Sequence, residues 1–174
     1  QDLLVEALIT TGKPLVAVFL TGNAYAMPWL KDVPAVVQAW YMGTEGGSAI
    51  ADVLSGDVAP SGKLPFSFPA RLQDCAPHSF DKMAYPGDSV REIYREDILV
   101  GYRWHDTKRV PPLFPFGHGL SYTTFKLSDA RVDSPSMTRD GKLTFTVKGQ
   151  TTSHRAAHAV EQLYTHHNTA ALPL

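Results

Sequence analysis

Apolar residues in the first third of the chain form two kinds of pattern, helical stripes and nearly unbroken runs. A stripe typical of an amphipathic helix, which Gly12 is placed to end, consists of Leu3, Leu4, Ala7 and Leu8. Residues 15–20 and 35–40 are runs rich in apolar and β-branched side chains, as in strands covered on both faces. The alternation of helix and strand predicts an α/β layer with parallel strands.

Two more helices are expected in this part. Residues 26–31 suggest a short one. Thr44 is in position to cap a longer one that ends at Gly56 and whose apolar face consists of Ala49, Ile50, Val53 and Leu54.

Residues 57–118 follow neither pattern. Most of the chain's 13 prolines lie between Pro60 and Pro115, and this density predicts loops and short irregular strands. Within the region, residues 63–68 suggest an edge strand, and residues 98–104 are apolar enough to be buried.

From Thr124 onward the period of the pattern changes to two. Residues 125–132 and the alternating stretch around 143–147 predict antiparallel strands, with a turn at Asp140-Gly141 between them. Val160 to Tyr164 is a third candidate strand. Because a β-sandwich takes about seven strands, this last domain is expected to be incomplete here. We therefore place one domain at residues 1–120 and a second at 121–174.

Composition excludes several classes of protein. The net charge of −1 and the absence of basic clusters argue against nucleic acid or a membrane surface as partner. The longest apolar run, residues 15–20, is too short to cross a bilayer. The single cysteine, Cys75, excludes a disulfide framework and a cysteine-based zinc site. Gln1 leads directly into the first helical stripe, so a targeting segment is expected only in a removed or preceding part.

Several motifs occur in a fixed order along the chain. They include Thr11 to Pro14 (TGKP), Gly43 to Gly47 (GTEGG), Pro60 to Pro65 (PSGKLP), Tyr94 to Tyr102 (YREDILVGY) and Pro115 to Phe125 (PFGHGLSYTTF). Together they resemble the C-terminal portion of glycoside hydrolase family 3, of the bacterial exo-β-glucosidase type. The resemblance implies an (α/β)₆ sandwich domain, present here as its C-terminal part, followed by the start of a fibronectin type III-like domain.

The resemblance also implies retaining hydrolysis of terminal β-D-glucosyl residues, which takes two carboxyl groups about 5–5.5 Å apart. The family's nucleophile is an aspartate of an N-terminal (β/α)₈ barrel, in a Ser-Asp-Trp or Ser-Asp-Tyr context. The only Ser-Asp pair here, Ser128-Asp129, precedes Ala130 in the β-like tail and is a false match. The acid/base is a glutamate upstream of the TGKP segment. We therefore expect no catalytic residue in this chain, with the barrel of the same protein as its partner.

The resemblance implies no cofactor and no metal, and it suggests a periplasmic or secreted protein. His154 and His158 are four apart, but without a convincing helix or an acidic ligand they do not predict zinc; His166 and His167 follow them. Glu45 is expected to serve the helix dipole rather than catalysis.

Three residues are candidates for the rim of a sugar-binding cleft. Arg91 and Tyr94 lie in a charged segment that is either a solvated face with weak ion pairs or part of such a rim. Trp29 follows Pro28 and is the tryptophan best placed for a surface role, whereas Trp40 is expected in the core.

Two other functional classes stay open. One is a non-catalytic carbohydrate-binding or scaffolding module that uses the same fold. The other is a small α/β hydrolase or nucleotide-binding protein, which the lack of a Gly-x-Ser-x-Gly elbow and of phosphate-loop spacing disfavours.

Overall fold

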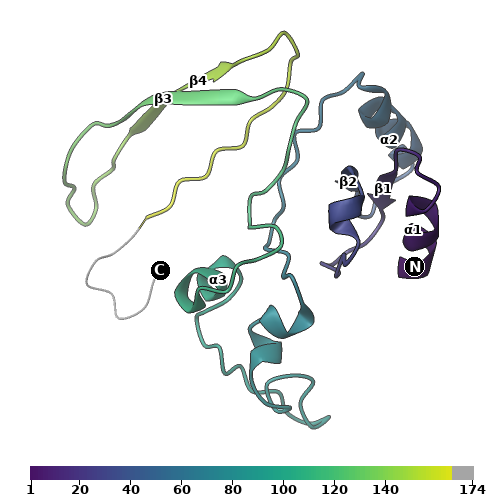
Figure 1. Ribbon diagram of the computed structural model, residues 1–174. Coiled ribbons are helices and arrows are strands. Elements are labelled where there is room, and N and C mark those ends of the chain that lie inside the picture. Colours follow the sequence, from purple (N-terminus) through teal and green to yellow (C-terminus); the bar gives the residue numbers. More distant parts are fainter. Residues whose placement is uncertain (166–174) are drawn as a thin grey trace. The chain divides into compact units, whose positions relative to one another are not determined.

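The computed structural model describes residues 1–165, which form short helices and two small sheets joined by long loops (Figure 1). The described chain divides into two compact units. The first comprises residues 1–50, 63–118 and 162–165, and the second comprises residues 51–62 and 119–161. Each unit thus takes in a short segment from the other side of residue 120, and the domain boundary expected there stays a prediction.

The first sheet consists of two parallel strands. Strand β1 (Val16–Phe19) pairs with β2 (Ala35–Gln38), and Val16 lies beside Ala35. Both strands were predicted from their apolar runs, and both are confirmed. The described residues do not cover both faces of this sheet, because Val16 is 48% exposed.

Helix α1 (Asp2–Ile9) forms where the stripe predicted it, but a different face packs inward. Val5 and Ile9 contact the core, whereas Leu3 and Leu4 are 80% and 64% exposed. The stripe of Leu3, Leu4, Ala7 and Leu8 is therefore not the face that packs on the described core. The helix is apolar on two sides, so its pattern alone could not tell which side the chain itself covers.

The core of the first unit is built mainly from aromatic rings. Its buried residues are Met27, Trp29, Val33 and Phe68. The ring of Phe19 stacks on Trp29 with 5.7 Å between centroids. Of the helix predicted over 26–31, only a 3₁₀ turn is present, η1 (Leu30–Asp32). Trp40, expected in the core, packs edge-on against Phe68 and is half-buried.

The proline-rich region is mostly loop, as predicted. It contains two 3₁₀ turns, η2 (Leu72–Asp74) and η3 (Pro77–Ser79), and helix α3 (Tyr102–Lys108). The edge strand expected over 63–68 is reduced to one bridge between Phe68 and Phe114. Residues 98–104 are only partly buried, because they turn into α3: Leu99 and Trp104 are buried, but Val100 is 57% exposed.

The PFGHG turn closes back on the proline-rich region. The Leu64 N–H donates to the His118 carbonyl, and the Gly117 N–H donates to the Leu64 carbonyl, both at 2.8 Å. Gly117 has a φ of +81°, and a Cβ there would lie 2.3 Å from Oε1 of Gln162. The motif therefore needs glycine for its backbone conformation, whereas the flexible Gln162 side chain can move aside.

The second unit contains an antiparallel pair, β3 (Phe125–Val132) and β4 (Phe145–Thr151), with an irregularity between Ser128 and Arg131. Strand β3 has the predicted bounds, and the predicted turn is present, because the Gly141 N–H donates to the Thr138 carbonyl. The strand expected at Val160 to Tyr164 is absent; those residues have no regular structure. Phe145 and Val147, expected on a half-buried face, are 52% and 46% exposed.

Helix α2 (Gly46–Ser55) ends in a polar clasp within the second unit. The Tyr122 hydroxyl donates to the Val53 carbonyl and Nη1 of Arg155 donates to the Gly56 carbonyl, each at 2.7 Å. The Arg155 guanidinium also lies over the Tyr122 ring. The Val53 carbonyl also accepts the Gly56 N–H, and Gly56 directly follows the helix, so the clasp adds side-chain donors to the carbonyls at the helix end. At the other end, Glu45 rather than Thr44 directly precedes the helix, and its carbonyl accepts the Ala49 N–H.

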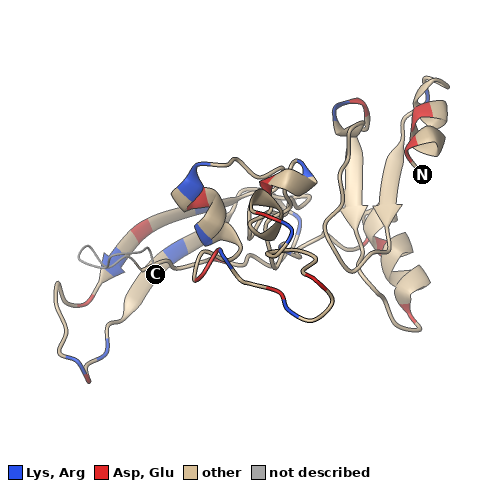
Figure 2. Cartoon of the chain, turned by 90° about the horizontal axis from the view of Figure 1, so that it is seen from below, with Lys and Arg blue, Asp and Glu red and all other residues tan. Residues whose placement is uncertain are grey.

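Charges of both signs alternate along the described chain without a large single-sign segment (Figure 2). No helix among residues 1–165 is long and apolar enough to cross a membrane.

Candidate functional site

Arg91 and Tyr94 lie on one loop, residues 81–95, of the first unit. Tyr94 is 73% exposed, and the Arg91 side chain is 72% exposed. The Arg91 guanidinium is 3.6 Å from the Asp88 carboxylate, an exposed pair that contributes little to stability. Both side chains are accessible from solvent, as a rim role requires, and the role itself stays a prediction.

Two aspartates hold the shape of the 81–95 loop. The Asp81 carboxylate accepts the backbone N–H groups of Met83 and Ala84 and forms a 2.9 Å ion pair with Arg95. These contacts lower the pKa of Asp81, with the Arg95 hydrogen bond as the largest cause. Asp81 thus joins the beginning of the loop to its end.

The tip of the loop is held by a second set of hydrogen bonds, centred on Asp88. Asp88 Oδ1 accepts the N–H groups of Val90 and Arg91 at 3.0 and 2.8 Å, and these bonds lower the pKa of Asp88. The Asp88 N–H donates in turn to the Arg91 carbonyl. Such a turn, in which a short acidic side chain binds nearby backbone, fixes the loop without buried apolar bulk.

Trp29 does not lie at the surface. It is 5% exposed, and its Nε1–H donates to Asp2 Oδ1 at 3.0 Å, which attaches α1 to the core. The surface position predicted for Trp29 is therefore wrong. A proline before a tryptophan indicated a loop, but an indole with a polar partner at its edge is readily buried.

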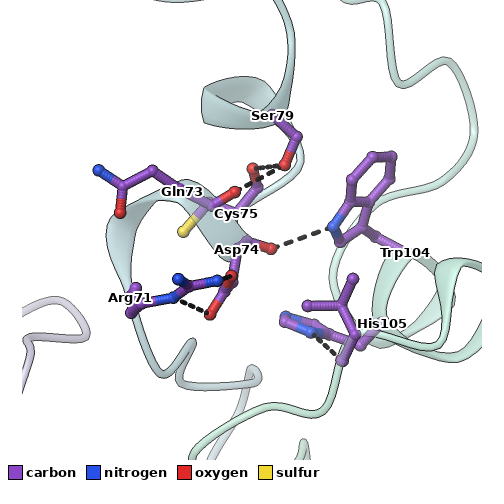
Figure 3. A network of polar contacts seen from close by, with 8 residues as sticks. Arg71, Gln73, Asp74, Cys75, Ser79, Trp104 and His105 are labelled. Carbon is purple, nitrogen blue, oxygen red and sulfur yellow. Dashed lines mark hydrogen bonds and ion pairs between the residues drawn. The ribbon is translucent and has the colours of Figure 1, made fainter.

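A network of polar contacts lies in the segments on either side of the loop in the sequence (Figure 3). The Trp104 Nε1–H donates to the Asp74 carbonyl at 3.0 Å, and Arg71 pairs with the Asp74 carboxylate at 2.8 Å. The Ser79 hydroxyl contacts the Gln73 and Cys75 carbonyls, each at 2.8 Å. Every group here binds backbone or an opposite charge, so the network joins η2, η3 and α3 and is structural.

Cys75 lies within this network and is only partly accessible. Burial, followed by the nearby Asp74 charge, raises the pKa of its thiol. A thiol with a raised pKa is a poor nucleophile.

Four carboxyl groups, those of Asp74, Asp81, Asp88 and Asp133, have a lowered pKa, each mainly because an Arg side chain or a backbone N–H group donates a hydrogen bond to it. A carboxylate whose charged form is stabilised in this way is a poor general acid. Glu45 is exposed at the start of α2, in agreement with a structural role. Asp57 is a turn residue, since its carboxylate accepts the Ser55 hydroxyl at 2.7 Å.

Sequence reasoning passed over Glu96, which it counted as one charge in an exposed cluster. Glu96 is only 8% exposed, and one of its carboxylate oxygens is buried without a hydrogen-bond partner among the described residues. Its place in the sequence, between Arg95 and Asp97, gives no signal of burial.

No group of three or more potential metal ligands occurs among residues 1–165. The predicted absence of a zinc site at His154 and His158 stays a prediction, since His166 and His167 lie outside the described residues.

Comparison with known proteins gives a consistent result. Residues 1–122 match the profile of the glycosyl hydrolase family 3 C-terminal domain. A β-glucosidase of Bacteroides ovatus is 55% identical over 164 residues, which are 94% of this chain and 22% of the relative. A β-glucosidase of Rhizobium radiobacter is 46% identical over 95% of this chain and 20% of its own length. The chain thus spans about a fifth of the curated relatives that it matches.

The chain is also similar in structure to solved β-glucosidases. A β-glucosidase from Streptomyces venezuelae in complex with D-glucose has a TM-score of 0.77 and 47% identity, over 84% of this chain and 18% of its own. β-Glucosidase 3B from Thermotoga neapolitana, in complex with glycerol, has a TM-score of 0.78 and 34% identity, over 90% of this chain and 22% of its own.

Proposed function

This chain belongs to glycosyl hydrolase family 3, as part of its C-terminal domain, and we propose that it is a segment of a retaining β-glucosidase whose two catalytic carboxylates lie outside it. The observation that carries the proposal is the match to β-glucosidases over 94–95% of this chain but only 20–22% of their length. The substrates are terminal β-D-glucosides.

In this proposal the chain supplies one wall of the active site, and an N-terminal (β/α)₈ barrel of the same polypeptide supplies the other. Its parallel β1–β2 pair represents the C-terminal part of an (α/β)₆ sandwich, and the β3–β4 hairpin begins a fibronectin type III-like domain. Arg91 and Tyr94 form part of the cleft rim, which their exposure supports. Export to the periplasm or medium belongs to the same proposal, and fractionation of the source cells tests it.

Hydrolysis of an aryl β-glucoside tests the function directly. The full-length polypeptide is expected to turn over the substrate, whereas the purified chain of 174 residues is not. Turnover by this chain alone, abolished by Glu45→Gln, would overturn both the segment assignment and the structural role of Glu45.

One feature favours the alternative of a carbohydrate-binding module. A hollow of about 370 Å³ in the first unit is lined by Tyr102, Phe116, Gln162, Leu163, Tyr164 and Thr165. Aromatic rings beside amide and hydroxyl groups suit a sugar. Titration of the chain with gluco-oligosaccharides distinguishes the two functions, because saturable binding without the barrel favours the module.

A further inference from the structure

We propose that the 81–95 loop is a preformed docking surface for the N-terminal part of the same polypeptide, so that it is covered by protein in the full-length enzyme. The inference rests on the proposed function, which supplies that part. It assigns the loop a protein partner in addition to the sugar contact proposed for Arg91 and Tyr94.

The first observation is the number of large apolar side chains that the loop leaves in solvent. Their exposed fractions are 87% for Val90, 73% for Tyr94, 49% for Tyr85 and 40% for Ile93. Single exposed apolar residues are ordinary, but four within fifteen residues of one loop indicate a contact surface.

The second observation is that the loop is rigidly built although its apolar groups face outward. The Ile93 N–H donates to the Met83 carbonyl at 2.8 Å, and Arg95 pairs with Asp81, so the two limbs are joined at two levels. Ala84 of the first limb is fully buried. A surface that is already ordered loses little conformational entropy on binding, which favours a stable contact.

The chemistry of the exposed side chains indicates that the tip of the loop contacts protein rather than sugar. Val90 and Ile93 offer only C–H groups, which cannot satisfy the hydroxyls of a glycoside and would leave them without partners. Four of the nearby charges are paired within the loop, Asp88 with Arg91 and Asp81 with Arg95. An apolar patch with a polar rim is the usual anatomy of a protein interface.

The length of the relatives indicates that the protein partner of the loop is another part of the same polypeptide. This chain covers only 20–22% of them, so about four-fifths of such a polypeptide lies outside it. A partner on the same chain is present at a high effective concentration, so a patch of this modest size suffices to bind it.

The test uses the full-length polypeptide that contains this chain, carrying Val90→Cys. The rate of maleimide labelling is measured at the peptide containing position 90, by mass spectrometry, in the native protein and after unfolding in urea. We expect labelling in the native monomer to be at least tenfold slower than in the unfolded state. Equal rates would overturn the proposal.

Two further labelling experiments test whether a sugar or a second copy of the protein covers the loop instead. Protection that requires added glucose or cellobiose would make the loop a sugar contact, and protection that is lost on dilution would make its partner a second copy; either result overturns the proposal. Hydrolysis of an aryl β-glucoside is measured in parallel, because its absence would refute the proposed function without affecting the labelling result.

Matched substitutions give an independent readout. Since Val90 is 87% exposed, Val90→Asp leaves the loop's own fold intact, whereas it places a charge in the proposed interface. We expect Val90→Asp to lower the melting temperature of the full-length protein and the near-isosteric Val90→Thr to change it less. Identical melting of Val90→Asp and the wild type would contradict docking.

Discussion

At position 87 the backbone takes a conformation that glycine adopts without strain. Gly87 has a φ of +79°, and a Cβ there would lie 2.2 Å from the carbonyl oxygen of Arg91. The obstacle is backbone within the same hydrogen-bonded loop, so it cannot move aside as a flexible side chain would. Gly87 is therefore a requirement of the 81–95 loop.

We predict that Gly87→Ala destabilises the protein by about 2–3 kcal/mol, because strain and a steric clash add. Gly12→Ala is the matched control: its φ is +66°, but nothing lies within 4 Å of the added Cβ, so about 1 kcal/mol is expected. Urea unfolding of the two variants measures the difference. Equal losses would mean that the loop relaxes around the methyl group.

His118 of the PFGHG turn gives a prediction for pH. Its ring stacks on Phe114, and burial, with a smaller contribution from Lys63, lowers its pKa below the ordinary value. As the pH falls below about 6.5, the unfolded chain takes up this proton before the folded one, so the stability of the fold decreases. The loss of stability between pH 7 and pH 5 should be smaller in His118→Gln. Parallel pH profiles of the two proteins would contradict this account of His118.

At the scale of elements, the clasp at the end of α2 offers a test. Tyr122→Phe removes the hydroxyl that binds the Val53 carbonyl, and we predict a loss of about 0.5–1 kcal/mol, at the low end because the site is partly solvated. Tyr41→Phe is the control, since that ring is 81% exposed, and its unfolding midpoint should not change. If both variants unfold like the wild type, the bond does not stabilise α2.

The strands show what a sequence pattern can predict at this scale. The positions of β1 and β2 were predicted from unbroken apolar runs, and that of β3 from the period of two that begins near residue 124. The face of α1 that packs inward was not predicted, and the strand predicted at residues 160–164 is absent. Both features depend on which other residues cover these segments. Leu3 and Leu163 are 80% and 65% exposed, so the described chain provides no apolar cover for either.

At the scale of the whole molecule, the sequence motifs predicted the family but only part of the candidate site. Arg91 and Tyr94 were proposed because charge and aromatic rings stand out in a sequence, and their role stays a prediction. Glu96 and Val90 were missed, since burial of a carboxylate and exposure of a valine depend on tertiary structure. Trp29 was misplaced for the same reason, as its core neighbour Phe68 and its hydrogen-bond partner Asp2 are distant in the sequence.

The central claim is that this chain belongs to a retaining β-glucosidase and holds neither catalytic carboxylate. A 2-deoxy-2-fluoro-glucoside with a good leaving group tests it most directly, because a retaining enzyme is trapped as its covalent glycosyl intermediate. Peptide mass spectrometry of the inactivated full-length polypeptide should place the sugar on an aspartate outside residues 1–174. A labelled residue within this chain, or hydrolytic activity that leaves no covalent label, would contradict the account.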